Sequence, residues 1–366
     1  MMPDWMIVIA AAVVVVLFVF IIGISTKKKE EIPTFSTTKQ LFDENLHIDE
    51  LPQCDVEDVS LDKDQFRAFN PSVSLVNDDM LYSFRVSNYV GCDKNSGKPV
   101  RDPNVIIGDK VKNYIMLSNM NDDIININIP DHAHPKCVTG FEDARLIVTP
   151  DNKNVLLIAN SHSNANCYTE MHLITIPYED IVKTFESSSK PKVLNVDDSQ
   201  VLRLYLEDHF KPSNNEKNWM PFFDGNDLMF VYSINPHIIL KCDMSTGECK
   251  KVSETLNHKV NSSLRGSSQA RLYQDQYVAI AHWRLSTSSY VTQAYTFEKE
   301  TPYKITAISP PFVINDQANR AETLVQFVSG FEIYNDTAYI TYGEKDCDSK
   351  LFKVSMSSLL SSMKKV

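Results

Sequence analysis

Short strand-like segments separated by polar turns dominate the chain after residue 61, and they constrain its fold most strongly. Most apolar runs there are four to seven residues long, are rich in Val, Ile, Tyr and Phe, and end at Asp, Asn, Gly or Ser. This pattern is typical of β-strands joined by turns. Stretches with a helical period are few, and we expect a short helix over Val201–Phe210 and a C-terminal helix over Ser355–Lys365.

Five segments of this region share one plan: a polar or charged cluster, a short strand, a turn, and a second strand that ends in aromatic or polar residues. They run from Phe69 to Arg85, Gly140 to Ser161, Lys217 to Ser233, Leu264 to Arg284 and Glu322 to Gly343. Each unit has about 60 residues, which suits a four-stranded blade with its loops. The plan therefore predicts an all-β, five-bladed β-propeller over residues 62–366, with the polar clusters facing a central funnel. A two-sheet β-sandwich with polar turns is the alternative.

An uncharged segment of 22 residues, Trp5–Thr26, precedes this region. A helix of that length spans a hydrocarbon core of about 30 Å, so we expect a single transmembrane anchor within residues 1–26. A cleaved signal peptide is the alternative. Residues 27–61 are polar and predict a stalk. The lysines at 27–29 favour a cytoplasmic C-terminal part, whereas sequons at Asn261 and Asn335 suit a lumenal one, so the side of the membrane stays open.

Composition excludes some functions. The net charge is −11, from 36 Lys and Arg against 47 Asp and Glu, which argues against a nucleic-acid partner. No glycine-rich phosphate motif occurs, and no cofactor is expected. The seven cysteines are odd in number and scattered, so they do not predict a disulfide framework. A bridge between Cys242 and Cys249 nevertheless fits the hairpin that they bracket.

Cations gather in the polar clusters despite this acidic balance. They are Arg67, Arg85, Arg145, Lys217, Arg265, His282 and Arg284, and the carboxylates beside them are Glu142, Asp143, Glu322 and Asp346. Such a funnel suits glycosyl transfer, because an acid must protonate the bridging oxygen while cations hold a phosphate or nucleotide. For any one of these residues alone, a structural ion pair is the more common role.

Five phrases of the sequence carry a family resemblance. They are Phe69-Asn70-Pro71-Ser72, Tyr82-Ser83-Phe84-Arg85, the run from Gly140 to Arg145, Ala281-His282 with Tyr290, and the run from Tyr342 to Asp346. In this order they resemble the signature of the β-mannoside phosphorylases. That glycoside hydrolase family consists of five-bladed β-propellers and is related to β-1,2-mannosyltransferases.

The resemblance implies an inverting reaction at a mannoside, with Asp143 as the general acid. It also implies two groups of binding residues. The sugar-binding group is Asn70, Arg85, Glu142, Arg145 and Asp346, and the phosphate-binding group is Lys217, Arg265, His282 and Tyr290. The implied partners are a mannose-containing glycan together with phosphate, mannose 1-phosphate or GDP-mannose.

The third unit departs from the family pattern. Phosphorylases of the family carry two phosphate-binding arginines there, but Met220–Phe223 and Val231–Pro236 contain none. Loss of two cations weakens a free-phosphate site, so a membrane-anchored transferase is expected in preference to a phosphorylase.

Other readings of the sequence stay open. A propeller that binds a glycan or a protein without catalysis is one alternative, and a β-mannoside hydrolase with Glu322 as its base is another. D-x-D phrases begin at Asp62 and Asp346, and His132, His134 and Cys137 lie close together, but these signals are too weak to predict a metal site.

Overall fold

The computed structural model describes ten stretches of the chain: 36–37, 41–42, 48–51, 66–88, 111–119, 123–163, 165–207, 215–286, 289–314 and 325–366. The predicted anchor and most of the predicted stalk lie outside these stretches. Among the residues that are described, no helix is long and apolar enough to span a bilayer.

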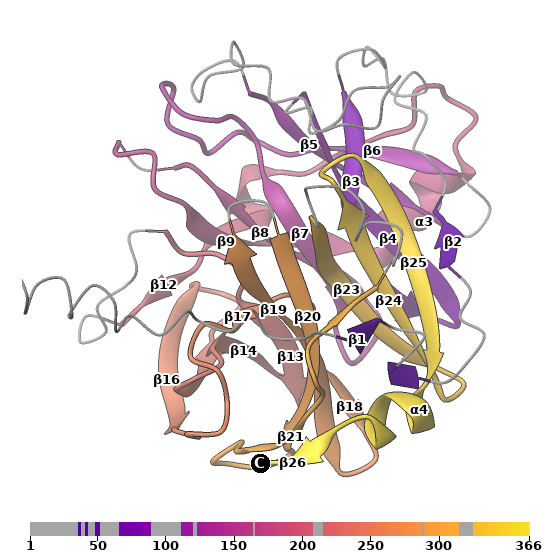
Figure 1. Cartoon of the computed structure of the whole chain (residues 1–366). Helices are drawn as coiled ribbons and strands as arrows, with labels where there is room; N and C mark the ends of the chain where they lie inside the picture. The colour runs from indigo at the N-terminus through magenta and orange to yellow at the C-terminus, as the bar shows by residue number, and fades with distance from the viewer. Residues whose placement is uncertain are drawn as a thin grey trace, which may run out of the picture. The chain divides into compact units, whose positions relative to one another are not determined.

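The described strands form five separate sheets (Figure 1). The first has the order β10-β6-β5-β4-β3, and the second has the order β11-β9-β8-β7. The strands of the first are β3 (Arg67–Val76), β4 (Asp79–Ser87), β5 (Asn113–Ser118), β6 (Ile124–Asn128) and β10 (Val193–Asn195). Those of the second are β7 (Glu142–Val148), β8 (Asn154–Ser161), β9 (Glu170–Pro177) and β11 (Val201–Arg203).

The third sheet has the order β12-β16-β15-β14-β13, and the last has the order β2-β25-β24-β23. The strands of the third are β12 (Tyr205–Leu206), β13 (Met220–Asp224), β14 (Asp227–Ser233), β15 (His237–Cys242) and β16 (Glu248–Thr255). Those of the last are β2 (Ile48–Glu50), β23 (Gln326–Tyr334), β24 (Thr337–Glu344) and β25 (Asp348–Ser355).

The fourth sheet has eight strands and is built around the long β19–β20 hairpin. Its strands are β1 (Ser36–Thr37), β17 (Arg265–Gly266), β18 (Arg271–Tyr273), β19 (Gln276–Ser286), β20 (Ser289–Glu298), β21 (Ile305–Ile308), β22 (Phe312–Val313) and β26 (Lys364–Lys365). Each of the five segments identified in the sequence thus contributes inner strands to a different sheet.

Turn chemistry explains two of the inner hairpins. Asn77-Asp78 joins β3 to β4 and Asn335-Asp336 joins β23 to β24, and all four residues have positive φ between 47° and 67°. Two-residue hairpin turns require this left-handed backbone, and Asn and Asp adopt it at low cost. The Asn-Asp pairs therefore fix the register of both hairpins.

Contacts between the sheets close into a ring. β3 contacts β7, β7 contacts β13, β14 contacts β17, β19 contacts β23, and β23 contacts β3. The buried side chain of Gln269 joins three of these sheets, because it donates to Leu146 O at 3.0 Å and Val73 O at 2.5 Å and accepts from Phe331 N at 3.3 Å. Radial sheets of this kind form a β-propeller, so the two-sheet sandwich is wrong.

Apolar side chains fill the spaces between neighbouring sheets. One cluster contains the fully buried Leu117 of β5 and Leu157 of β8, and another contains Phe222 of β13 and Tyr295 of β20. This packing holds the inner strands rigidly and gives their polar ends fixed positions.

The helix predictions were only partly right. Residues 201–203 and 205–206 form β11 and β12, because this segment crosses from β9 of the second sheet to β16 of the third. The C-terminal helix α4 covers Met356–Ser361, and the chain then returns to strand at β26. An unpredicted helix, α3 (Tyr178–Glu186), follows β9, with Ile181 buried and acidic residues in its first turn.

The expectation that the cysteines form no disulfide framework was wrong. Cys137 is bonded to Cys167, 30 residues away, and Cys242 is bonded to Cys249 across the β15–β16 hairpin. The short bridge fits the spacing of its hairpin. The long bridge joins two loops of the second sheet that only the fold brings together.

Candidate active site

The inner strands of the first two sheets carry the same irregularity. The ladder between β3 and β4 shifts register between Phe69 and Ser72, and that between β7 and β8 shifts between Glu142 and Arg145. Asn70 and Asp143 lie at these bulges with φ of 49° and 50°. A left-handed residue in a bulge re-aims its side chain, and Asn and Asp tolerate this conformation.

The two bulges bring Asn70 and Asp143 into contact. Asn70 Nδ2 donates to Asp143 Oδ1 at 2.9 Å. Gly343 of β24 makes room for this arrangement, because a Cβ at that position would lie 2.0 Å from Asn70 Oδ1. Gly343 in the last unit therefore leaves the space that the Asn70 side chain of the first unit occupies.

Arg85 at the end of β4 joins two carboxylates. Its Nη1 lies 3.2 Å from Asp143 Oδ1, and its Nη2 lies 3.0 Å from Glu142 Oε1. The side chains are 11% exposed for Arg85 and 17% for each acid, so water screens these contacts weakly. Burial opposes the charge of Arg85, but Glu142 and Asp143 raise its pKa above the usual range. One guanidinium thus fixes both adjacent acids.

Glu142 accepts contacts from several elements. Asn113 Nδ2 lies 3.3 Å from its Oε1, Asn160 Nδ2 lies 3.4 Å from its Oε2, and His162 Nε2 lies 3.6 Å from Oε1. Burial alone would raise the pKa of Glu142, but Arg85, His162 and Asn160 hold it at about 2. Glu142 is therefore a permanent anion at neutral pH.

The environment of Asp346 raises its carboxyl pKa, whereas that of Glu142 lowers it. Asp346 follows β24 in a left-handed turn, with φ of 52°. Burial raises its pKa to about 6, and the negative charges of Asp143 and Glu142 add to this effect, although Arg85 opposes it. Three carboxylates from two sheets therefore share one cation.

Arg145 lies beneath the acids and links them to the fourth sheet. It is 1% exposed, and its guanidinium donates to Asp143 O at 2.7 Å, Ser267 O at 2.8 Å and Asn218 Oδ1 at 2.8 Å. Burial lowers its pKa to about 10. This placement suits a residue that positions the Asp143 backbone, which differs from the sugar-binding role that the resemblance implies for Arg145.

His282 lies on the other side of Arg145. Its Nδ1 is 2.9 Å from Ser267 Oγ, and its ring packs edge-on against Tyr290 at 5.3 Å between centroids. Burial, together with the positive charges of Arg145, Lys217 and Arg265, lowers the pKa of His282 to about 3. A neutral imidazole therefore lies in a field of convergent positive charge, as an anion subsite requires.

The structure brings together most of the residues that the sequence singled out. Asn70, Arg85, Glu142, Asp143 and Asp346 form the carboxylate half, and Lys217, Arg265, His282 and Tyr290 lie on the cationic side, with Arg145 between them. Lys217 and Arg265 are exposed, whereas His282 is buried. Glu322, the candidate base of a hydrolase, lies outside the described residues.

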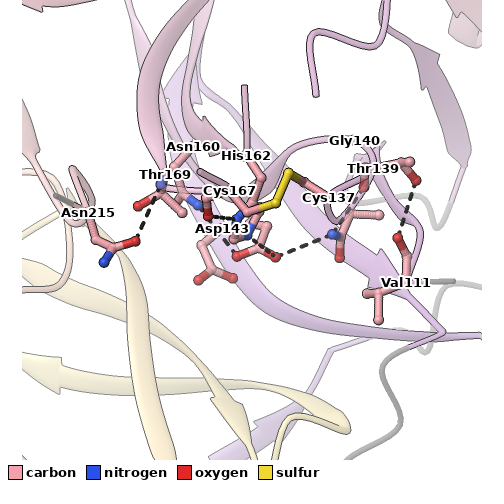
Figure 2. A network of polar contacts seen from close by, with 12 residues as sticks. Val111, Cys137, Thr139, Gly140, Asp143, Asn160, His162, Cys167, Thr169 and Asn215 are labelled. Carbon is pink, nitrogen blue, oxygen red and sulfur yellow. Dashed lines mark hydrogen bonds and ion pairs between the residues drawn. A yellow bond between two sulfur atoms is a disulfide. The ribbon is translucent and has the colours of Figure 1, made fainter. Parts of the chain in front are cut away.

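Sequence reasoning missed three neighbours of Glu142: Asn113, Asn160 and His162. The segment identified in the sequence ended at Ser161, one residue before His162. The polar residues at the end of β8 were therefore the signal that could have revealed this neighbour. Of the possible metal ligands His132, His134 and Cys137, Cys137 is held in the disulfide with Cys167 (Figure 2). Among the described residues, no cluster of His, Cys, Asp or Glu could hold a metal ion.

Asp346→Asn is expected to stabilise the fold at neutral pH. Because the pKa of Asp346 is raised in the folded state, the stability that its protonated form contributes is fully present below pH 3.8. This stability is lost as pH rises through about 6. Asn mimics the protonated acid and tolerates the positive φ. We expect a gain of roughly 1–2 kcal/mol at pH 7.5, after allowance for partial exposure.

The measurement is urea unfolding of both proteins at pH 3.8 and 7.5. The gain should disappear at the lower pH. An equal change at both pH values, or a loss of stability at pH 7.5, would contradict the assigned environment of Asp346.

The fold of this chain is similar to that of several known proteins. No family model matches the chain. The chain nevertheless resembles β-mannosyltransferases in part of its sequence and β-mannoside phosphorylases in its β-propeller fold. The β-1,2-mannobiose phosphorylase of Listeria innocua matches 87% of this chain and 99% of its own, with a TM-score of 0.53 and 13% identity. A member of glycoside hydrolase family 130 that targets β-1,2-mannosidic linkages matches 79% of this chain and 84% of its own, with a TM-score of 0.52 and 12% identity.

Relatives in sequence are local matches. Beta-mannosyltransferase 3 of Candida albicans is 41% identical over 76 residues, which are 20% of this chain and 14% of that protein. Beta-mannosyltransferase 1 of Komagataella phaffii is 28% identical over 142 residues, which are 35% of this chain and 19% of that protein. The chain therefore matches less than a fifth of the length of these two relatives.

Proposed function

We propose that the chain is a carbohydrate-active enzyme that makes or breaks β-mannosidic bonds with inversion. The observation that carries this proposal is a fixed pair of acids, Glu142 and Asp143, that Arg145 and Ser267 connect to His282. Inverting chemistry at a sugar needs one placed acid, and a phosphorylated donor needs a cationic subsite. Local sequence similarity to β-mannosyltransferases and a fold shared with a β-1,2-mannobiose phosphorylase support a β-mannoside as the substrate.

The proposed roles follow the two halves of the site. Asn70, Arg85, Glu142 and Asp346 hold the mannosyl unit, and Arg145 keeps Asp143 in place. Lys217, Arg265, His282 and Tyr290 hold the phosphate of mannose 1-phosphate or GDP-mannose. We also propose that the five sheets are the blades of one five-bladed propeller, which the contact between β23 and β3 supports.

In the synthetic direction, an acceptor hydroxyl attacks C1 of an α-mannosyl phosphate from the face opposite the leaving group. The bond between C1 and the phosphate oxygen breaks, and its electron pair leaves with the phosphate. The acceptor's proton passes to Asp143, directly or through a sugar hydroxyl. In the reverse direction, Asp143 returns this proton to the bridging oxygen.

Transfer is the preferred direction over phosphorolysis with free phosphate. Where phosphorylases carry two arginines, β13 presents Met220 and Phe222, and both side chains are buried in an apolar cluster. Tyr232 on β14 donates to Glu216 instead of offering a cation. The phosphate of a donor is covalently joined to the mannosyl unit, so contacts to the sugar help to bind it, whereas a free phosphate ion depends on its own cationic contacts.

The purified full-length chain, incubated with manno-oligosaccharides, tests this proposal. Mannose 1-phosphate and GDP-mannose serve as donors, and β-1,2-mannobiose with inorganic phosphate tests the reverse reaction. We expect an extended oligosaccharide with at least one donor. Saturable glycan binding without any product would support a non-catalytic propeller, and phosphate-independent cleavage would support a hydrolase.

We further propose that residues 1–26 anchor the chain in a membrane and that the propeller faces an oxidising compartment. Disulfides such as Cys137–Cys167 and Cys242–Cys249 persist in such compartments and are rare in the cytosol. This observation favours the lumenal side over the cytoplasmic side indicated by the lysines at 27–29. Protection of the C-terminal part from protease in sealed microsomes tests the orientation, and digestion without detergent would contradict it.

A further inference from the structure

His162, at the end of β8, contacts two oxygen acceptors beside the candidate catalytic acids. Its Nδ1 lies 2.8 Å from Cys167 O (Figure 2). Its Nε2 lies 3.6 Å from Glu142 Oε1. The first contact is a hydrogen bond, and the second is an ion-pair distance. The side chain is 19% exposed, so the imidazole is largely shielded from water.

This geometry favours the doubly protonated imidazole. A carbonyl oxygen only accepts, so Nδ1 must carry a proton. In the neutral ring the lone pair of Nε2 would then face the carboxylate of Glu142, which is unfavourable. Only the cation satisfies both neighbours.

Charged groups around His162 act in the same direction on balance. Glu142 of β7 raises the pKa of His162, burial lowers it, and Arg85 of β4 opposes the second charge. Asp143 lies beyond Arg85, and Glu170 at the start of β9 interacts with Ser163 and with Arg203. The net effect raises the pKa of His162 above 6.5.

A disulfide-closed loop holds the Cys167 carbonyl in place. Cys137 and Cys167 join the loop before β7 to the loop after β8, and His134 N donates to His162 O at 2.9 Å. The second loop continues to the cationic side, where Glu216 N donates to Thr169 O at 2.9 Å, next to Lys217. The loop therefore connects the carboxylate half of the site with the phosphate half.

We propose that His162 is a positioning residue, whose charged imidazole, anchored by the disulfide-closed loop, orients Glu142 for binding of the sugar. This inference rests on the proposed function for its role in the reaction, but the charge of His162 can be measured without any substrate. Because the pKa of His162 is raised, its contact with Glu142 is complete below pH 6.5 and is lost as pH rises through the folded value.

Histidine NMR titration of the full-length chain tests the pairing. His162→Gln assigns the resonance, and exposed His258 is an internal reference. We expect a pKa of His162 above 6.5 that falls in Glu142→Gln and in the double variant Cys137→Ser/Cys167→Ser, while His258 does not change. A His162 pKa at or below 6.5 in the unaltered chain, or one that Glu142→Gln leaves unchanged, would overturn the proposal.

Kinetics test the positioning role. His162→Gln should raise KM for the mannosyl donor about tenfold with little change in kcat, and it should remove the rise of KM between pH 6.5 and 8. His258→Gln is the matched control and should change neither. An unchanged KM and pH profile in His162→Gln would refute the role. Absence of turnover with every donor would refute the proposed function, while the titration would still decide the charge of His162.

Discussion

Asp143→Asn should lower turnover of a mannosyl donor by about a thousandfold, which lies within the usual range for loss of a placed general acid or base. Asn cannot accept the proton that the acceptor hydroxyl loses, and it cannot donate the proton that the bridging oxygen gains in the reverse direction. The substitution should keep the site's shape, because Asn tolerates a φ of 50° and its Oδ1 can still accept from Asn70 and Arg85. The loss should therefore appear in kcat more than in KM.

Initial rates and thermal unfolding, measured on the same preparation, check this result. Asp227→Asn is the matched control, because Asp227 lies on β14 in an exposed ion pair with Lys241 at 2.7 Å. It should leave turnover unchanged. If Asp143→Asn kept more than about a tenth of the activity while folded, Asp143 would not be the acid.

Arg145→Met should destabilise the protein by roughly 2–4 kcal/mol, because three buried acceptors lose their donor. Those acceptors are the carbonyl oxygens of Asp143 and Ser267 and the amide oxygen of Asn218, which belong to three different sheets or their edges. The Arg145 guanidinium also lies 5.4 Å from the centre of the Phe327 ring, and Met keeps part of this packing. The free energy of unfolding should fall at every pH from 6 to 8.

Denaturant unfolding of Arg145→Met and Arg203→Met makes the comparison. Arg203 is 60% exposed and makes one ion pair, with the 15% exposed Glu170, so its replacement should cost about 1 kcal/mol, less than that of Arg145. Equal losses for the two variants would show that Arg145 does not join the sheets energetically.

Local patterns in the sequence predicted much of the fold. The five segments form inner strands of different sheets because strand periodicity and turn residues act over short distances, as Asn77-Asp78 and Asn335-Asp336 illustrate. The short strands β1, β2, β10, β12 and β26 could not be predicted, because each is defined by pairing with a strand far away in the chain. The segment 201–206 looked helical for the same reason.

Residues of the candidate site could be predicted where they belong to short, continuous sequence motifs. Asn70 and Asp143 were identified from such phrases, and the bulges that bring them together are part of the same sequences. His162 and the Cys137–Cys167 disulfide were missed because their meaning depends on tertiary contacts with Glu142 and between two loops. Only the structure shows that the buried Arg145 contacts the Asp143 backbone, Ser267 and Asn218, and so connects the two halves of the site.

The most direct test of β-mannosyl transfer with inversion is the proton NMR spectrum of the product during turnover of α-mannose 1-phosphate or GDP-α-mannose with a manno-oligosaccharide. The spectrum should gain the anomeric signal of a new β-mannoside, at the rate of donor loss, and Asp143→Asn should not produce it. A new α-mannoside, or a β-mannoside formed equally well by Asp143→Asn, would contradict the account.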